Sequence, residues 1–147
     1  PFLRRPDPMP PVQFYEQLDP AVFVLRLVPG MRADIIPLLA PHYRALVVES
    51  FGVGGLPGGE HGEMYARLQD WCASGRLAVF TTQVPHEGCD LAVYEVGRSV
   101  KELPGVLEAK DMTPEAVAVK LMWALGQTTD RAEAMRLFTT PVEWDIV

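Results

Sequence analysis

The sequence predicts an α/β fold in which about four parallel strands are covered by helices on both faces. Short β-branched, apolar runs alternate along the chain with longer segments of helical periodicity, and this alternation is typical of βαβ units. One run, ALVVE at 45–49, is apolar at nearly every position, as a strand buried on both faces should be. Glycine or proline separates most of these segments, which indicates turns between them.

The composition indicates a single globular domain. Residues 1–13 contain five prolines and little periodicity, so we expect an extended Pro-rich linker or arm there and the domain itself over residues 14–147. Hydrophobic residues make up 48% and charged residues 22%, and no apolar run approaches the roughly 20 residues of a membrane span. No secretory signal is visible, and because the first residue is Pro1 we expect a fragment, a processed product or a trimmed piece of a longer protein.

The first strand is expected over residues 22–28 (VFVLRLV), because the run is rich in β-branched residues and ends at Pro29-Gly30. A short helix is expected over residues 31–39, which Pro37 makes irregular. The strand at 45–49 follows.

The middle of the chain combines a glycine-rich loop with a strand and a helix. The loop FGVGGLPGG covers residues 51–59, and an amphipathic helix is expected over residues 60–73, with Gly75 ending it as a C′ glycine. The third strand is expected over residues 77–81 and is followed by the loop TQVPHEGCD at 82–90.

The last part of the sequence is expected to form a short strand between helices. Residues 92–103 are expected to form a helix or irregular turn, and residues 106–108 a short fourth strand. Thr113 is expected to cap a helix whose first residue is Pro114 and which Gly126 closes. The last helix should begin with a capping box and end before a proline, at Asp130, Glu133 and Pro141.

Two loops lie where a parallel sheet binds ligands, beyond the carboxyl ends of its strands: 51–59 and 81–90. The glycines match no phosphate-binding pattern and are better explained by tight turns. The hydroxyls of Ser50, Thr81 and Thr82 at the strand ends can bind a ligand or bond to a local turn, and we favour the turn.

The cysteines and histidines give little support for a catalytic or metal site. Cys72 and Cys89 can form one disulfide, but we favour two reduced thiols in a cytoplasmic protein. The spacing of His42, His61 and His86 is not that of metal ligands, and a nucleophilic pair of His86 with Cys89 has no further support. The net charge of −6 argues against a nucleic-acid surface.

Four segments together resemble a known family. They are VFVLRLVPGMRADII at 22–36, VVESFGVGGLP at 47–57, TTQVPHEGCDLAVYEVGR at 81–98 and GVLEAKDMTPEAVAVKLMWALGQT at 105–128. In this order and spacing they resemble the carboxy-terminal half of the type I, cytosolic bacterial L-asparaginases. The resemblance implies a small Rossmann-like α/β domain with four parallel strands.

The resemblance also implies a function. These enzymes hydrolyse L-asparagine to L-aspartate and ammonia without a metal or organic cofactor. Their catalytic threonine, aspartate and lysine lie in the amino-terminal domain, so no catalytic residue is expected in this chain. The carboxy-terminal domain contributes contacts to a homodimer or tetramer and closes a neighbouring subunit's active site. No nucleic-acid or membrane partner is implied.

The resemblance further implies which residues lie near substrate or effector. The loop that begins at Ser50 and contains Gly52, Gly54 and Gly55 matches the family loop that approaches the neighbouring active site, with Gly55 in place of an asparagine. Thr82 matches a family threonine beside the effector pocket of allosteric members.

Two further positions of the effector pocket depart from the family pattern. Glu49 replaces an arginine and Val84 replaces a cysteine. Because a glutamate repels the carboxylate that an arginine would clamp, we expect weak or absent activation by asparagine.

Three alternatives remain open from the sequence. The chain can belong to a close rival, either the asparaginase-like subunit of a glutamyl-tRNA amidotransferase or a broader asparaginase–glutaminase. It can be a stand-alone module that binds a small amino acid, or it can be a purely structural dimerisation unit. The missing amino-terminal half would decide between the close rivals and an asparaginase.

Overall fold

The computed structural model describes residues 11–52, 54–58, 62–84, 88–93, 95–142 and 145–146. Its elements run β1 (Val22–Arg26), α1 (Ile35–Leu39), β2 (Ala45–Ser50), α2 (Glu63–Ala73), β3 (Leu77–Thr82), α3 (Glu95–Lys101), β4 (Val106–Glu108), α4 (Pro114–Gln127) and α5 (Arg131–Thr139). The predicted α/β fold is confirmed. Glu60, His61 and His86 lie outside the described residues.

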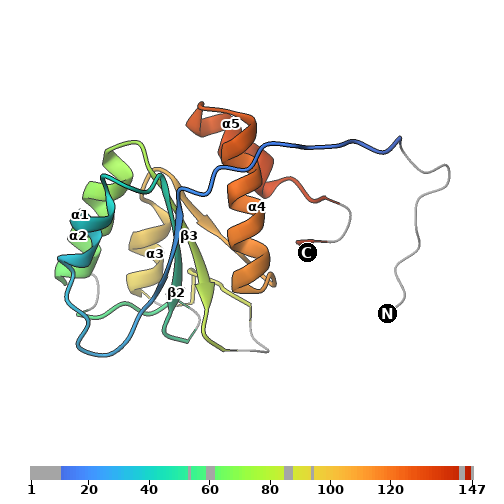
Figure 1. Cartoon of the computed structure of the whole chain (residues 1–147). Coiled ribbons are helices and arrows are strands. Elements are labelled where there is room, and N and C mark those ends of the chain that lie inside the picture. Colours follow the sequence, from blue (N-terminus) through green and yellow to red (C-terminus); the bar gives the residue numbers. More distant parts are fainter. Residues whose placement is uncertain are drawn as a thin grey trace.

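The four strands form one parallel sheet in the order β1-β2-β3-β4. In Figure 1, α1, α2 and α3 lie on one side of this sheet, and α4 and α5 lie on the other. All six residues of β2 are buried, as its apolar sequence predicts. The carboxyl ends of the strands therefore meet at one edge, together with the start of α4.

Side chains alternate between the two faces along each central strand and so build two separate cores. Leu46 and Val48 pack with α1, α2 and α3, whereas Ala45 and Val47 pack with α4 and α5. This alternation is the period of two expected of extended backbone. The sheet thus has no solvated face at its centre, which explains why its strands read as continuous apolar runs.

The first strand and helix are shorter than predicted. β1 ends at Arg26 rather than residue 28, and α1 begins at Ile35 rather than residue 31. Pro37 lies in the first turn of α1, where backbone N–H groups have no partner within the helix, so the helix tolerates it. Ile36 and Leu39 point into the core, as the spacing predicts.

The amphipathic α2 begins at Glu63, three residues later than predicted, and ends as predicted. Ser74 is its C-cap and Gly75 follows with a φ of +90°, the left-handed conformation that favours glycine at C′. Trp71 is buried, and its indole Nε1 donates a hydrogen bond of 2.8 Å to the carbonyl of Leu77. This bond ties α2 to the start of β3.

The prediction that Gly126 closes α4 was wrong, because the helix continues to Gln127. A Cβ at Gly126 would lie 2.5 Å from the carbonyl oxygen of Gln17. The residue is therefore small because the segment before β1 crosses the last turn of α4 here. At the other end, Thr113 caps α4 and Pro114 is its first residue, as predicted.

The capping box predicted for α5 is only half formed. The Asp130 carboxylate accepts a hydrogen bond of 2.8 Å from the backbone N–H of Glu133. In a complete capping box the Glu133 side chain would accept from the backbone N–H of Asp130. Here it accepts from Arg136, and the backbone N–H of Asp130 donates to the Thr128 hydroxyl. α5 ends at Thr139, before Pro141, as predicted.

Candidate functional site

A polar cavity of about 310 Å³ lies at the carboxyl edge of the sheet, where the strands point toward the start of α4. Arg26, Glu49 and Thr82 reach it from the ends of β1, β2 and β3, and Lys110 and Glu115 reach it from the β4–α4 region. This is the edge at which parallel sheets bind ligands. It is the lower edge in Figure 1.

Glu49 supplies the buried charge of the cavity. Its side chain is 11% exposed, and its Oε2 lies 3.4 Å from Nη1 of Arg26, a side chain that is 64% exposed. The two residues are register partners on β1 and β2, so the sheet itself places them side by side. Because Arg26 is largely in water, the pair contributes at most about 1 kcal/mol to stability.

The strand-end hydroxyls hold the loops together. Ser50 is fully buried beneath the cavity, and its Oγ donates a hydrogen bond of 2.9 Å to the carbonyl of Thr81. The Thr82 Oγ1 donates to the carbonyl of Gly52 and accepts from the backbone N–H of Val84 at 3.0 Å. Of these contacts, the bond from Val84 to Thr82 is local, as the turn interpretation predicts, whereas the other two join segments about 30 positions apart. Thr82 and Val84 also line the cavity beside Glu49.

Gln83 was not assigned a role from the sequence, yet its side chain joins the strand ends. Its Nε2 donates to the carbonyl of Leu27 at 2.7 Å and to that of Glu49 at 2.9 Å. These carbonyls follow β1 and lie in β2, so one amide fixes three strands at the edge of the cavity. The Leu27 carbonyl is 56 positions away in the sequence, and no local pattern could indicate the contact.

The glycine-rich loop lies beside the cavity rather than in its wall. Gly54 has a φ of +149°, and a Cβ there would lie 2.9 Å from the Leu91 side chain. The backbone of Gly55 exchanges two hydrogen bonds with Phe51, of 2.8 and 3.1 Å, which closes a tight turn. Among the described residues, Gly52 connects to the cavity through its bond with Thr82. The loop is therefore shaped by close backbone packing.

The segment between β4 and α4 was also not assigned to the site from the sequence. Lys110 has a φ of +52°, a conformation rare for a residue with a side chain. The turn brings residues 110–115 against the ends of β2 and β3. The signal that could have found it is positional: these residues follow a parallel strand, so they must lie at the same edge as the other two loops.

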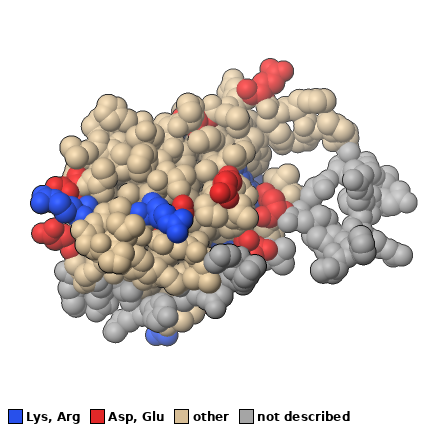
Figure 2. All heavy atoms as spheres, turned by 60° about the horizontal axis from the view of Figure 1, so that its bottom comes forward, with Lys and Arg blue, Asp and Glu red and all other residues tan. Residues whose placement is uncertain are grey.

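In the part of the chain that the structure describes, the cavity offers polar contacts and no nucleophile that is paired with a base. Among the described residues, Thr82 uses its hydroxyl on a backbone carbonyl, and no group of three metal-ligating side chains is present. Figure 2, tilted toward this edge, shows acidic and basic side chains interspersed, without a broad area of one sign. None of the helices in the described ranges has the length and apolarity to cross a membrane.

Both cysteines are buried, and neither forms a disulfide with the other. Burial raises the pKa of Cys72 to about 11, an effect that Arg131 partly opposes. Burial, with Glu108 and Asp90 nearby, raises the pKa of Cys89 to about 12. Neither thiol is therefore a nucleophile at neutral pH. Of the histidines, His42 is exposed as predicted.

The described residues thus form a parallel α/β domain with a polar cavity at the carboxyl edge of its sheet. Residues 21–138 match the family described as the glutaminase/asparaginase C-terminal domain. The chain therefore belongs to this family, and the resemblance found in the sequence is confirmed.

Individual relatives agree with the family. The L-asparaginase of Thermococcus kodakarensis is 38% identical over 133 residues, which are 90% of this chain and 40% of the relative. Its solved structure superposes with a TM-score of 0.81 at 36% identity, covering 89% of this chain and 39% of that one. A glutamyl-tRNA(Gln) amidotransferase subunit of Metallosphaera sedula is 36% identical over 140 residues, which are 95% of this chain and 30% of the relative. The chain thus spans 40% or less of these relatives.

Proposed function

We propose that this chain is the carboxy-terminal domain of an L-asparaginase, an enzyme that hydrolyses L-asparagine to L-aspartate and ammonia. In this role the domain contributes subunit contacts and helps to close a neighbouring active site, and it is inactive by itself. The observation that carries the proposal is the cavity at the carboxyl edge, where the Thr82 hydroxyl bonds to the Gly52 carbonyl instead of to a base. The L-asparaginase relatives support it. The lack of a disulfide between the two cysteines is consistent with a cytoplasmic location.

The test is ammonia release from L-asparagine by the 147-residue chain and by the full-length protein that contains it. We expect turnover only by the full-length protein. Clear turnover by the 147-residue chain would overturn the assignment of catalysis to another domain. If neither protein releases ammonia, the result would favour the amidotransferase subunit or a module that binds a small amino acid.

A second candidate is the asparaginase-like subunit of a glutamyl-tRNA amidotransferase, which the similarity to the Metallosphaera sedula protein favours. The two candidates differ in what the full-length protein needs. An asparaginase releases ammonia from free asparagine without a partner. A protein that hydrolyses an amide only when its partner subunit and glutamyl-tRNA are added would be identified as the amidotransferase component.

We propose that Glu49, Thr82 and Val84 form the counterpart of an effector pocket, with the loop of Ser50, Gly52, Gly54 and Gly55 turned toward the neighbouring subunit. The Glu49 carboxylate lines this cavity and is already paired with Arg26, so this arginine is less available to clamp the carboxylate of an effector. We therefore expect a hyperbolic dependence of rate on asparagine concentration for the full-length enzyme. A sigmoidal dependence that Glu49→Gln leaves unchanged would contradict this role.

We also propose that a second copy of the chain packs on an apolar groove of about 660 Å³ along α4, α5 and the segment before β1. Tyr15, Leu18, Val119 and Val142 line this groove, and each remains at least half exposed. Exposed apolar side chains gathered in one groove are typical of subunit interfaces. This surface fits the self-association that the family resemblance implies.

Analytical ultracentrifugation of the chain tests the groove. We expect a dimer that Val119→Asp converts to monomer. Leu38→Asp is the matched control, because Leu38 is similarly exposed on α1, on the opposite side of the sheet. A dimer that persists in Val119→Asp, or a monomer already in the unsubstituted chain, would refute the groove as the interface.

A further inference from the structure

A second cavity, of about 320 Å³, lies at the amino edge of the sheet, opposite the candidate site. It is enclosed by the turns before β2 and β3 and by the region between α4 and α5. Arg44, Arg76 and Arg131 line it together with His42, and no aspartate or glutamate does so among the described residues. In a chain with a net charge of −6, a cavity with such a lining is unexpected.

Arg76 is held in place by neutral acceptors. Arg76 donates to the carbonyls of Tyr43 and Ala40 at 3.2 and 2.7 Å and to the Ser74 hydroxyl at 2.6 Å, and it lies over the Trp71 ring. Such bonds fix the guanidinium without neutralising it. The geometry is therefore preorganised, since little rotamer freedom remains to be lost when a ligand binds.

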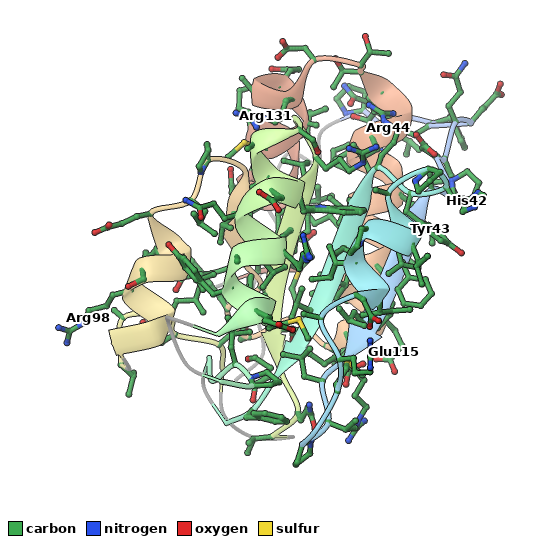
Figure 3. All side chains as sticks on the ribbon, turned by 90° about the vertical axis from the view of Figure 1, so that its left-hand side faces the viewer. His42, Tyr43, Arg44, Arg98, Glu115 and Arg131 are labelled. Atoms are coloured by element: carbon green, nitrogen blue, oxygen red, sulfur yellow. The ribbon has the colours of Figure 1, made fainter. Side chains whose placement is uncertain are left out.

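Arg131 has the most unused donor capacity. Its Nη1 donates to the carbonyl of Cys72 at 3.1 Å, and among the described residues this is its single hydrogen bond. Its Nε and Nη2 are thus available as a planar fork that matches a carboxylate or phosphate. Arg44, by contrast, is paired with Asp19 at 2.6 Å. Figure 3 shows Arg44 and Arg131 at the same end of the molecule.

The charges around the cavity do not cancel. Asp19 neutralises one of the three guanidiniums. The last turns of α2 and α4 also point their carbonyls here, at Cys72 and Leu125, and helix C-termini carry about half a negative charge each. Together they offset roughly one more unit, so about one positive charge remains for a ligand.

We propose that this amino-edge cavity is an oxyanion site that binds the carboxylate or phosphate group of a small ligand. Arg131 and Arg76 hold the anionic group, and the Thr129 and Ser74 hydroxyls line the same cavity. The volume is at the lower end of the range for small-molecule pockets, which restricts the ligand to a small metabolite. The site is independent of the cavity at the carboxyl edge.

The test is a titration of the isotope-labelled 147-residue chain, followed by amide chemical shifts at low ionic strength, with sodium phosphate and L-aspartate as separate probes and chloride as the salt control. We expect shifts at residues 42–44, 74–76 and 129–131, with a millimolar Kd. Arg131→Gln should raise the Kd about tenfold, and Arg131→Lys less, because a lysine keeps the charge but loses the fork.

Arg98→Gln is the matched control. Arg98 is exposed and also donates to a backbone carbonyl, that of Ala92, but it lies on α3, away from the cavity (Figure 3). We expect its Kd to stay within about twofold of the unsubstituted chain. A response to one probe alone would identify the anionic group. The proposal is overturned by the absence of shifts with both probes, by shifts confined to the carboxyl edge, or by an Arg131→Gln variant that keeps its fold and its affinity.

Discussion

At the scale of single residues, several polar side chains of the domain form hydrogen bonds that hold the backbone in place. Gln83 bonds two carbonyls, Arg76 bonds two carbonyls and a hydroxyl, and the Thr82 hydroxyl bonds the Gly52 carbonyl. Among the described residues, no buried side-chain nitrogen or oxygen lacks a hydrogen-bond partner. Unpaired polar groups in the interior are costly, so these side chains define the strand ends as firmly as the apolar core does.

A substitution of Gln83 tests whether these side chains stabilise the strand ends. We expect Gln83→Leu to lower the free energy of unfolding by about 1–3 kcal/mol, because the Leu27 carbonyl loses a partner in a half-buried site. Gln127→Leu is the matched control, since the Gln127 amide also donates to two carbonyls but is exposed. Urea unfolding measures both. An equal effect of the two substitutions would show that burial at Gln83 is not the cause.

A second prediction at this scale concerns the reactivity of the two thiols. With its pKa raised to about 11, Cys72 is ionised at pH 8 in about one molecule in a thousand. Cys89, with a pKa of about 12, is ionised still less. We expect a disulfide reagent such as DTNB to label the folded chain far more slowly than the urea-unfolded chain. Rapid labelling of either folded thiol would contradict the buried positions.

At the scale of elements, the segment before β1 and α4 depend on each other. Asp19 donates its backbone N–H to the carbonyl of Met122 at 2.9 Å, and Gln127 donates to the carbonyl of Gln17. Tyr15 meets the ring of Trp123 edge to face, with the ring centroids 5.2 Å apart. The segment thus packs along α4 over most of its last two turns.

Gly126→Ala measures this packing. In an isolated helix, alanine is favoured over glycine by about 1 kcal/mol. Here we expect a loss of about 1–3 kcal/mol in unfolding free energy, because the new Cβ would lie 2.5 Å from the Gln17 carbonyl. In a chain that lacks residues 1–18 the same substitution should be neutral or stabilising. Destabilisation of equal size in both chains would refute the steric explanation.

Lys120 links α4 to the carboxy-terminal segment. Its side chain is 6% exposed, and its Nζ lies 2.8 Å from the Asp145 carboxylate and 2.9 Å from the Thr140 carbonyl. Asp145→Asn leaves this ammonium without a counter-charge, so we expect a clear loss of stability. Lys120→Met removes the charge and should cost less. Thermal unfolding of the two variants tests this order. A larger loss of stability in Lys120→Met than in Asp145→Asn would contradict the explanation.

The elements also show which features local sequence can predict. β2 and β3 were predictable because they are buried on both faces and are therefore continuously apolar. The prediction that Gly126 ends its helix was wrong because the glycine is needed for close packing against Gln17. That residue lies more than a hundred positions earlier in the sequence. In the candidate site, Thr82 could be named from the end of its strand, whereas Glu49 was named only through the family resemblance. The pairing of Glu49 with Arg26 follows from strand register, which the local sequence does not encode.

At the scale of the whole molecule, the raised thiol pKa values link stability to alkaline pH. The unfolded chain begins to lose thiol protons near the ordinary pKa of 9.0, whereas the folded chain holds them until about 11 and 12. The thiol contribution to the unfolding free energy is therefore complete below pH 9 and declines as the pH rises toward these values. Urea unfolding at pH 8 and 10.5 measures the decline, which should be smaller in a Cys72→Ala/Cys89→Ala variant. An equal decline in the variant would assign it to other groups.

The order of the strands has a consequence for synthesis on the ribosome. Each strand pairs with the one before it in the sequence, so the sheet can grow in the order in which the chain emerges. The face formed by Val22, Ala45, Val47, Leu77 and Val79 stays uncovered until α4 follows, because α4 packs across β1, β2 and β3. A nascent chain that ends before α4 therefore exposes a broad apolar sheet, which is the form that chaperones bind and that aggregates most readily.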